Sequence, residues 1–251
     1  QPSATYRIMD RVAERRAQGA KIISLCAGEP DFDTPGHVRE AAIDAIEHGH
    51  TRYTQVAGVR SLREAVAAKF RRENGLDVAW QDTLVCNGGK QVIYNALAAT
   101  LNEGDQVIVP APCWVGYAGR VRLCEGVTWI VTCEADTGFK LTPGALAAAI
   151  TPQTRWLILN SPSNPTGAVY SREELRALAD VLLAHPHLLI LADDIYEHLI
   201  FDDQAFHTLA QVEPRLAPRT LTMNGVSKAY AMTGWRIGFA TGPRWLLEAM
   251  E

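Results

Sequence analysis

Short hydrophobic runs recur along most of this chain, separated by turns of polar residues and glycine. Runs of this length without alternation are typical of strands that are buried on both faces of a largely parallel sheet. The pattern therefore predicts a sheet of seven mostly parallel strands. The runs cover residues 83–86, 106–109, 127–131, 155–159, 187–192, 220–223 and 236–240.

Segments with helical periodicity lie between these runs. The sequence Ser-Arg-Glu-Glu at 171–174 has the form of a capping box and predicts a helix that extends to about Ala184. Amphipathic helices are also predicted at 38–47 and 59–73, each followed closely by a glycine. Strands that alternate with helices predict an α/β fold with three layers, α/β/α.

The first part of the chain lacks this alternation. We expect residues 1–35 to form an N-terminal arm, or part of a small domain, and residues 36–251 to form one large domain. The start lacks the basic and apolar regions of a signal peptide, and the chain has no apolar run of 18 residues. We therefore expect no membrane span.

Composition narrows the possible functions further. The net charge is −4 and the 24 basic residues are scattered, which argues against a nucleic-acid surface. The five cysteines form no CxxC pair, which indicates reduced thiols in a cytoplasmic protein and neither a disulfide framework nor a metal site.

The segment around Lys228 carries the first candidate chemistry. Ser227 precedes this lysine among small and apolar neighbours, and Arg236 follows eight residues later. Burial penalises an ammonium group, and a neutral amine can condense with a carbonyl. Serine and arginine suit a phosphate dianion, so the segment fits pyridoxal 5'-phosphate. A surface lysine beside a structural arginine explains this segment alone equally well.

A glycine turn follows the run at 83–86. Gly88, Gly89 and Lys90 open a predicted helix, and bare amides at a helix N-terminus bind phosphate. A tight turn that needs glycine is the alternative. The turn is neither GxGxxG nor a P-loop.

An acidic segment follows the run at 187–192. Asp193 at a strand end suits a protonated ring nitrogen, and Tyr196 suits a ring oxygen. The alternative is an acidic helix N-terminus, which fits Asp194 and Glu197 better. His198 is expected to be packed or solvated.

Two further strand ends carry candidates. The loop at 160–167 has two Asn and two Pro, which fix a turn and can present Asn164. Trp114, after the run at 106–109, could stack on a flat ring. Plain turn chemistry and a core tryptophan are the alternatives. All these candidates follow strand ends, and together they describe one pyridoxal phosphate site.

The sequence also resembles a known family from end to end. Residues 24–32, 160–167, 193–197 and 227–238 look like fold-type I aminotransferases. The Pro-Ser-Ala-Thr opening at 2–5 and the turn at 88–90 resemble the bacterial aspartate aminotransferases that include aspartate/prephenate enzymes. The resemblance implies that residues 36–251 are the cofactor-binding large domain. It also implies that a C-terminal small domain, with the arginine that binds the substrate α-carboxylate, is missing from this chain.

The resemblance implies specific roles. Lys228 would form the internal aldimine and act as the base, and Asp193 would keep the pyridine nitrogen protonated. Tyr53 would reach the phosphate across a homodimer interface. Gly28, Trp114 and Asn164 would contact substrate. The implied cofactor-binding residues are Gly88, Gly89, Lys90, Trp114, Asn164, Asp193, Tyr196, Ser227, Lys228, Arg236 and Tyr53.

The implied activity is ping-pong transamination, with aspartate as amino donor and 2-oxoglutarate, or alternatively prephenate, as acceptor. Gln1 stands where prephenate-using members often have a basic residue, which argues against prephenate. Two alternatives remain open: another pyridoxal phosphate reaction on the same fold, and a non-catalytic sensing domain of a transcription regulator. We expect a chain of this extent to be poorly active by itself.

Overall fold

A computed structural model describes residues 4–251 of the chain; Pro2 and Ser3 of the opening motif lie outside them. The strands are β1 Thr83–Cys86, β2 Gln106–Ala111, β3 Val127–Thr132, β4 Thr154–Asn160, β5 Leu189–Asp193, β6 Thr220–Gly225 and β7 Gly238–Thr241. The α-helices are α1 Ala4–Ala17, α2 Gly36–Glu47, α3 Arg60–Asn74, α4 Gly89–Ala98, α5 Gly116–Leu123, α6 Pro143–Ala149, α7 Arg172–Leu183, α8 Leu209–Val212 and α9 Arg244–Met250.

The strands within residues 4–251 form one seven-stranded sheet in the order β1-β7-β6-β5-β4-β2-β3. Strand β7 is antiparallel to both of its neighbours, and the remaining pairs are parallel. The prediction of a mostly parallel sheet of seven strands is confirmed.

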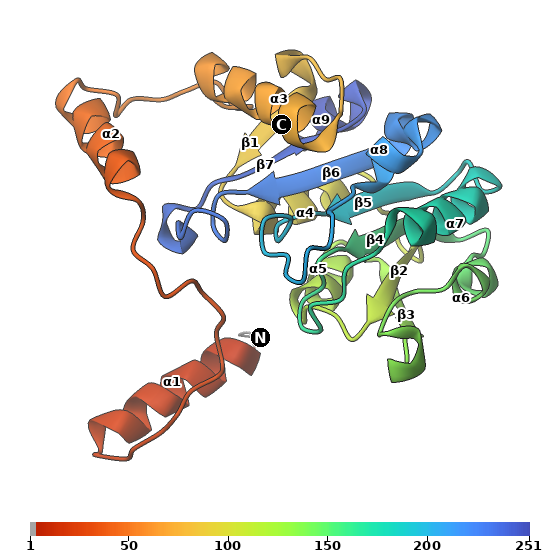
Figure 1. The fold of residues 1–251 in the computed structure, drawn as a ribbon, viewed down its shortest axis with the longest axis horizontal. Helices are drawn as coiled ribbons and strands as arrows, with labels where there is room; N and C mark the ends of the chain where they lie inside the picture. The colour runs from red at the N-terminus through yellow and green to blue at the C-terminus, as the bar shows by residue number, and fades with distance from the viewer. Residues whose placement is uncertain (1–3) are drawn as a thin grey trace.

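Helices cover both faces of the sheet, which confirms the three-layer prediction (Figure 1). Alternate residues of β2 show why both faces need cover: Val107 and Val109 pack with α4 and α5, whereas Ile108 packs on the other side with α6 and α7. Helix α9 completes the first layer, and α8 the second. Helix α3 packs on Phe239 of β7 through Phe70, with the rings edge to face at 5.7 Å.

One strand differs from the sequence prediction. Strand β3 was expected to be buried on both faces, but Val127, Trp129 and Ile130 are between 44% and 49% exposed. It is the edge strand beside β2, so only one side of its backbone is paired. An apolar run alone does not separate an edge strand from a central one.

Local signals at two helix ends are confirmed. The side chain of Ser171 accepts from the backbone of Glu174, and the Glu174 carboxylate accepts from the backbone of Ser171, which completes the capping box of α7. Helix α3 ends at Gly75, whose φ of 62° lies in the left-handed region that favours glycine.

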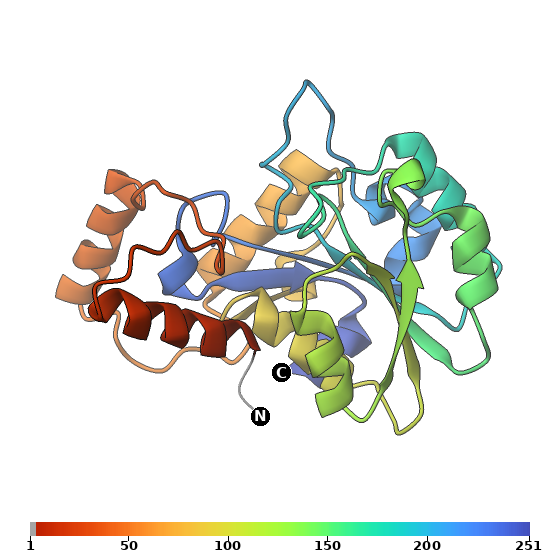
Figure 2. The same ribbon diagram turned by 90° about the horizontal axis from the view of Figure 1, so that it is seen from below.

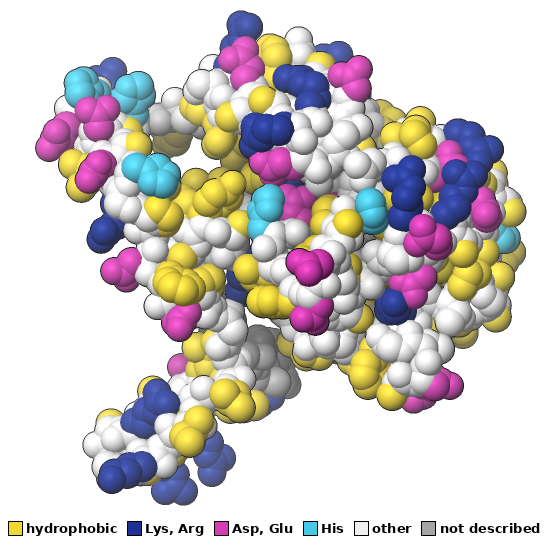
Figure 3. All heavy atoms as spheres, in the orientation of Figure 1, with side chains coloured by type: hydrophobic (Ala, Val, Ile, Leu, Met, Phe, Trp, Pro, Cys, Tyr) yellow, Lys and Arg dark blue, Asp and Glu magenta, His cyan; other side chains and the backbone are white. Residues whose placement is uncertain are grey.

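The N-terminal segment stands off this layered body. Helices α1 and α2 lie apart from the sheet and its covering helices (Figures 1 and 2), and α2 has no buried residue. Apolar side chains gather along the stretch between these helices (Figure 3). Ile23 and Leu25 are more than 90% exposed there. Across residues 4–251, no helix combines the length and apolarity that a membrane crossing requires.

Candidate active site

The predicted site residues other than Tyr53 meet at one edge of the sheet, where strands end. Because β7 runs opposite to its neighbours, its first residue, Gly238, pairs with the last residues of β1 and β6, Cys86 and Gly225. The ends of β4 and β5 lie at the same edge, where Asn160 pairs with Asp193. The segments that follow these strands, and the one that precedes β7, therefore converge.

A glycine turn and an arginine form the candidate phosphate site. Gly88 is the N-cap of α4 and has a φ of 84°, and it makes no side-chain cap bond to the first backbone amides of α4. The Arg236 guanidinium lies so close to Gly88 that an added Cβ would overlap it. A helix N-terminus beside a guanidinium group is suited to a phosphate dianion.

Arg236 itself takes an unexpected backbone conformation. The sequence predicted a strand that begins at residue 236, but Arg236 has a φ of 57° and β7 begins at Gly238. Its guanidinium donates to the carbonyl of Thr233 at 2.8 Å. The left-handed turn directs the arginine toward Gly88 instead of along the sheet.

Lys228 lies half-buried just beyond the end of β6, directly after the half-buried Ser227. Its Nζ donates to the carbonyl oxygen of Gly28 at 2.6 Å and lies 5.9 Å from the centre of the Tyr196 ring. Burial lowers the pKa of the Lys228 ammonium group, and Glu29 opposes this shift. The neighbouring cations Lys90 and Arg236 lower that pKa further.

Asp193 is the last residue of β5 and is buried. Tyr117, from α5, donates a hydrogen bond of 2.6 Å to Oδ2 of Asp193, and the amide of Ile195 donates to Oδ1 at 3.4 Å. Burial raises the pKa of the Asp193 carboxyl to about 6, while these two donors act against the rise.

Sequence reasoning missed Tyr117, which is fully buried and stands three residues after Trp114. The indole of Trp114 meets the Tyr117 ring edge to face at 5.3 Å. The Arg120 guanidinium lies 4.8 Å from the Trp114 ring. The i, i+3 spacing of two aromatic residues at the start of a helix was the available signal.

The asparagine loop after β4 reaches the same place. Asn160 donates to the carbonyl oxygen of Asp193 at 2.8 Å and accepts from the backbone of Asn164 at 2.8 Å. The Asn164 amide in turn donates to the Tyr196 hydroxyl at 3.4 Å. Burial raises the pKa of Tyr196, so its hydroxyl keeps its proton at neutral pH.

Residues 28–34 of the N-terminal segment are held against the loop that carries Lys228. Thr34 donates to the carbonyl of Ala231 at 2.7 Å and accepts from the indole of Trp235 at 3.1 Å. An open cavity of about 660 Å³ lies between these two segments. This contact places Gly28 beside Lys228.

Tyr53 stands apart from this arrangement, since its side chain is fully exposed in the single chain. Its expected contact across a dimer interface stays a prediction.

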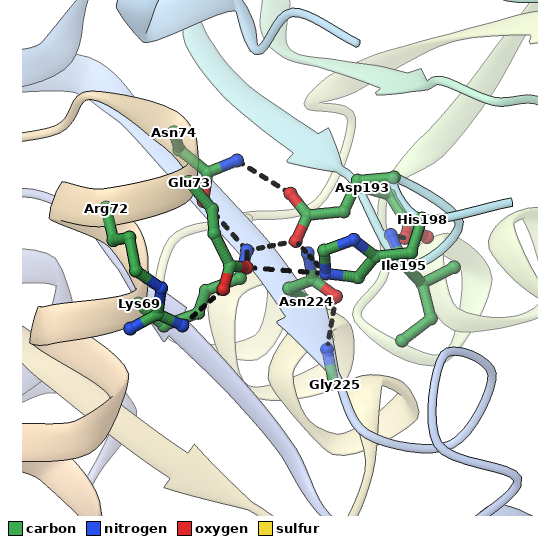
Figure 4. Close-up of polar contacts among 10 residues, drawn as sticks. Lys69, Arg72, Glu73, Asn74, Asp193, Ile195, His198, Asn224 and Gly225 are labelled. Carbon is green, nitrogen blue, oxygen red and sulfur yellow. Dashed lines mark hydrogen bonds and ion pairs between the residues drawn. The ribbon is translucent and has the colours of Figure 1, made fainter. Parts of the chain in front are cut away.

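The acidic segment after Asp193 is not a helix N-terminus. Residues 195–198 form turns, and Glu197 is buried against Asn74 and Lys69 of α3. His198 is half-exposed and forms an ion pair with Glu197 at 3.2 Å (Figure 4). The interpretation of Asp194 and Glu197 as acids at a helix N-terminus was therefore wrong, because no helix begins within residues 193–198. Both side chains are buried instead.

Comparison with known proteins places this geometry in a family. The profile of "Aminotransferase class I and II" matches residues 20–251. A probable aspartate/prephenate aminotransferase of Rhizobium leguminosarum bv. phaseoli is 56% identical over 250 residues, which cover 100% of this chain and 62% of the relative. The aspartate/prephenate aminotransferase of Cereibacter sphaeroides is 56% identical over 249 residues, covering 99% and 62%.

Solved structures agree with this assignment. The aspartate aminotransferase of Rhizobium meliloti has 51% identity and a TM-score of 0.95, and the match covers 100% of this chain and 65% of that one. That of Thermus thermophilus with maleate has 47% identity and a TM-score of 0.95, covering 100% and 64%. The chain spans about 62% of the length of the curated relatives that it matches. It belongs to the class I and II aminotransferase family and has the α/β fold of that family's large domain.

Proposed function

We propose that this chain forms the cofactor-binding part of a pyridoxal 5'-phosphate-dependent aminotransferase that uses aspartate as amino donor. The observation that carries the proposal is the convergence of Lys228, Asp193 and Tyr196 with the glycine turn at one sheet edge. The names of the relatives favour aspartate and prephenate as substrates. The proposed reaction is ping-pong, with 2-oxoglutarate as the alternative acceptor.

The polar groups of the site suit both the phosphate and the ring nitrogen of this cofactor. A Cβ at Gly88 would overlap the Arg236 guanidinium, so glycine at this position lets the cation approach the N-terminus of α4, where a phosphate dianion would bind. At the other end, Oδ1 of Asp193 receives only a long bond from the Ile195 amide, so it can accept from a ring nitrogen. Bound pyridoxal phosphate supplies an aldehyde and an electron-withdrawing ring, which stabilises negative charge at the substrate Cα.

The backbone amides of Gly89 and Lys90, the Ser227 hydroxyl and the Arg236 guanidinium would hold the phosphate. The Trp114 indole would stack on the ring. These groups would hold the cofactor within reach of Lys228.

The remaining side chains control protons. Asp193 would hold a proton on the ring nitrogen, and its burial strengthens that charge-assisted bond. The Tyr196 hydroxyl, supported by Asn164, would donate to the ring oxygen. The lowered pKa of Lys228 favours a neutral Nζ, which can take the proton from the substrate Cα. Gly28 and Asn164 would contact the substrate carboxylate.

The proposal extends to assembly and location. A homodimer would cover the exposed apolar side chains of the N-terminal segment and bring Tyr53 to the partner's phosphate site. The proposal keeps the division into an arm of residues 1–35 and a large domain of residues 36–251, in which α2 lies apart from the layered body. Five free thiols suit the reducing cytoplasm.

Reduction with borohydride tests the cofactor site directly. The complete protein is incubated with pyridoxal phosphate, reduced and digested, and we expect the cofactor mass on the Lys228 peptide. Lys228→Ala should abolish the label. A label that persists in this variant, or none in the unaltered protein, would refute the site. Formation of oxaloacetate from aspartate then tests the donor.

A further inference from the structure

A buried polar network joins α3 to the turn that follows β5. Glu197 lies within this turn, and its Oε2 accepts from Nδ2 of Asn74 at 2.6 Å. Lys69 forms an ion pair with Oε1 of Glu197 and donates to Oδ1 of Asn74 at 2.7 Å. Three side chains thus close a ring of polar contacts. Two of them, Lys69 and Asn74, come from α3 (Figure 4).

The burial of this network makes its geometry specific. Asn74 is 1% and Glu197 is 6% exposed, and the Lys69 side chain is 12% exposed. An unpaired charge or amide at this depth would be strongly unfavourable, so each group requires the other two. Asn74 and Glu197 are 123 residues apart, so their hydrogen bond ties together two segments that are distant in the sequence.

The same cluster has ligand atoms of a kind that bind metal ions. Side-chain atoms of Glu73, Glu197 and His198 lie within 4.8 Å of one another. However, the Lys69 ammonium group contacts both carboxylates, with Glu73 at 3.7 Å. Lys69 supplies the positive charge at this point, so the cluster is better explained as an ion-pair network.

The position of Glu197 in the chain gives this network its significance. The preceding residue is Tyr196, which contacts Asn164 and faces Lys228. Two adjacent side chains therefore contact different parts of the molecule: Tyr196 lies in the candidate active site, and Glu197 binds to α3. Beyond the turn the chain becomes exposed, with Phe201 at 76%.

We propose that Lys69, Asn74 and Glu197 are positioning residues that anchor this turn to α3 and thereby hold the Tyr196 hydroxyl toward the cofactor site. The proposal rests on the proposed function for its effect on the cofactor. Its effect on local stability does not depend on the cofactor. Without the anchor, residues 195–199 open more often, and the Tyr196 hydroxyl spends less time near the cofactor site.

Glu197→Gln tests the anchor in the complete protein, because it keeps the side-chain size and an acceptor oxygen while removing the charge that pairs with Lys69. Glu64→Gln is the matched control: it is the same substitution in α3, in an exposed ion pair with Arg60 at 2.8 Å. We expect amide hydrogen exchange at residues 195–199 to accelerate at least about tenfold in Glu197→Gln and to be unchanged in Glu64→Gln.

Cofactor affinity provides the second measurement. The Kd for pyridoxal phosphate should rise about fivefold in Glu197→Gln, but not when Tyr196→Phe is already present, because the anchor acts through the Tyr196 hydroxyl. A merely structural role would weaken binding equally in both backgrounds. That additive result would overturn the proposal.

Removing one charge of a buried pair can unfold a protein, so a second variant is needed. Lys69→Met combined with Glu197→Gln removes both charges of this pair, and Glu73, which loses Lys69, keeps Arg72 and His198 as ion-pair partners. We expect it to fold and to show the same fast exchange at 195–199. Unchanged exchange in the folded variants would overturn the anchor, whereas failure of the unaltered protein to bind pyridoxal phosphate would overturn the proposed function instead.

Discussion

The hydroxyl group of Tyr117 donates a hydrogen bond of 2.6 Å to Oδ2 of Asp193, and both side chains are buried. The bond joins the start of α5 to the end of β5 through two residues that are 76 positions apart along the chain. It fixes the carboxylate plane through Oδ2, while Oδ1 accepts a long bond of 3.4 Å from the Ile195 amide. Asp193 is thus oriented before any ligand binds.

Tyr117→Phe removes this donor without changing the ring. The pKa of Asp193 should rise further, because the Tyr117 bond acts against the effect of burial. A hydrogen bond to a charged group contributes about 1.5–3 kcal/mol, so the Kd for pyridoxal phosphate should rise at least about tenfold. Carbon-13 NMR of labelled aspartate and calorimetry would measure both changes. Tyr94→Phe, at an exposed tyrosine of α4, is the control. A fall in the pKa of Asp193 would contradict this interpretation.

Asp193→Asn should change how stability depends on pH in the cofactor-free protein. The folded-state pKa of about 6 lies above the ordinary value of 3.8, so folding favours the protonated carboxyl. Its contribution is fully present below pH 3.8 and is lost as pH rises through 6. Asparagine avoids this loss. The variant should therefore gain about 3 kcal/mol relative to the unaltered protein between pH 4 and pH 7.

Urea denaturation of the cofactor-free protein at several pH values would measure this difference. Asp180→Asn, at the solvent-exposed Asp180–Arg176 pair of α7, should show no such gain. A constant difference between Asp193→Asn and the unaltered protein across this range would show that Asp193 keeps an ordinary pKa.

The charges around Lys228 predict that removing Glu29 and removing Lys90 change the reactivity of Lys228 in opposite directions. The Glu29 carboxylate raises the pKa of Lys228, and the Lys90 ammonium lowers it. Glu29→Gln should therefore increase the rate at which acetic anhydride modifies Lys228 at pH 7, by up to about fivefold. Lys90→Gln should decrease the rate. Peptide mass spectrometry would measure the modification rate in both variants. A change of the rate in the same direction in both would exclude an electrostatic cause.

The sequence predicted much of the fold and site for a physical reason. Parallel strands buried on both faces must be continuous apolar runs, and the polar residue that follows each run lies at a common edge. Asp193 was found in this way, whereas Lys228 was found from its apolar neighbours together with Ser227 and Arg236. The two glycines marked the turn at 88–89, because a residue without a side chain leaves only backbone amides to bind a ligand there.

Other features depended on contacts between distant segments. Nothing in the sequence pairs Tyr117 with Asp193, or Glu197 with Asn74, because each contact exists only once the helices are packed on the sheet. The acidic run that contains Glu197 has the composition of a helix start, but it forms turns because Glu197 packs against α3. The exposure of β3 was likewise hidden, since strand order is a property of the whole sheet.

The glycine turn also depends on close packing against β7, and this gives a last prediction. A Cβ at Gly238 would overlap the backbone of Gly88 and Gly89, which cannot move aside as a flexible side chain could. Gly238→Ala should therefore lower the free energy of unfolding by about 1–3 kcal/mol and displace the α4 N-terminus. Gly119→Ala is the matched control, because nothing lies within 4 Å of its added Cβ in α5. Alanine there should stabilise the helix by about 0.5–1 kcal/mol. Urea denaturation gives both free energies, and the Kd for inorganic phosphate should rise only in Gly238→Ala. If Gly238→Ala binds phosphate as the unaltered protein does, the turn does not form the phosphate site.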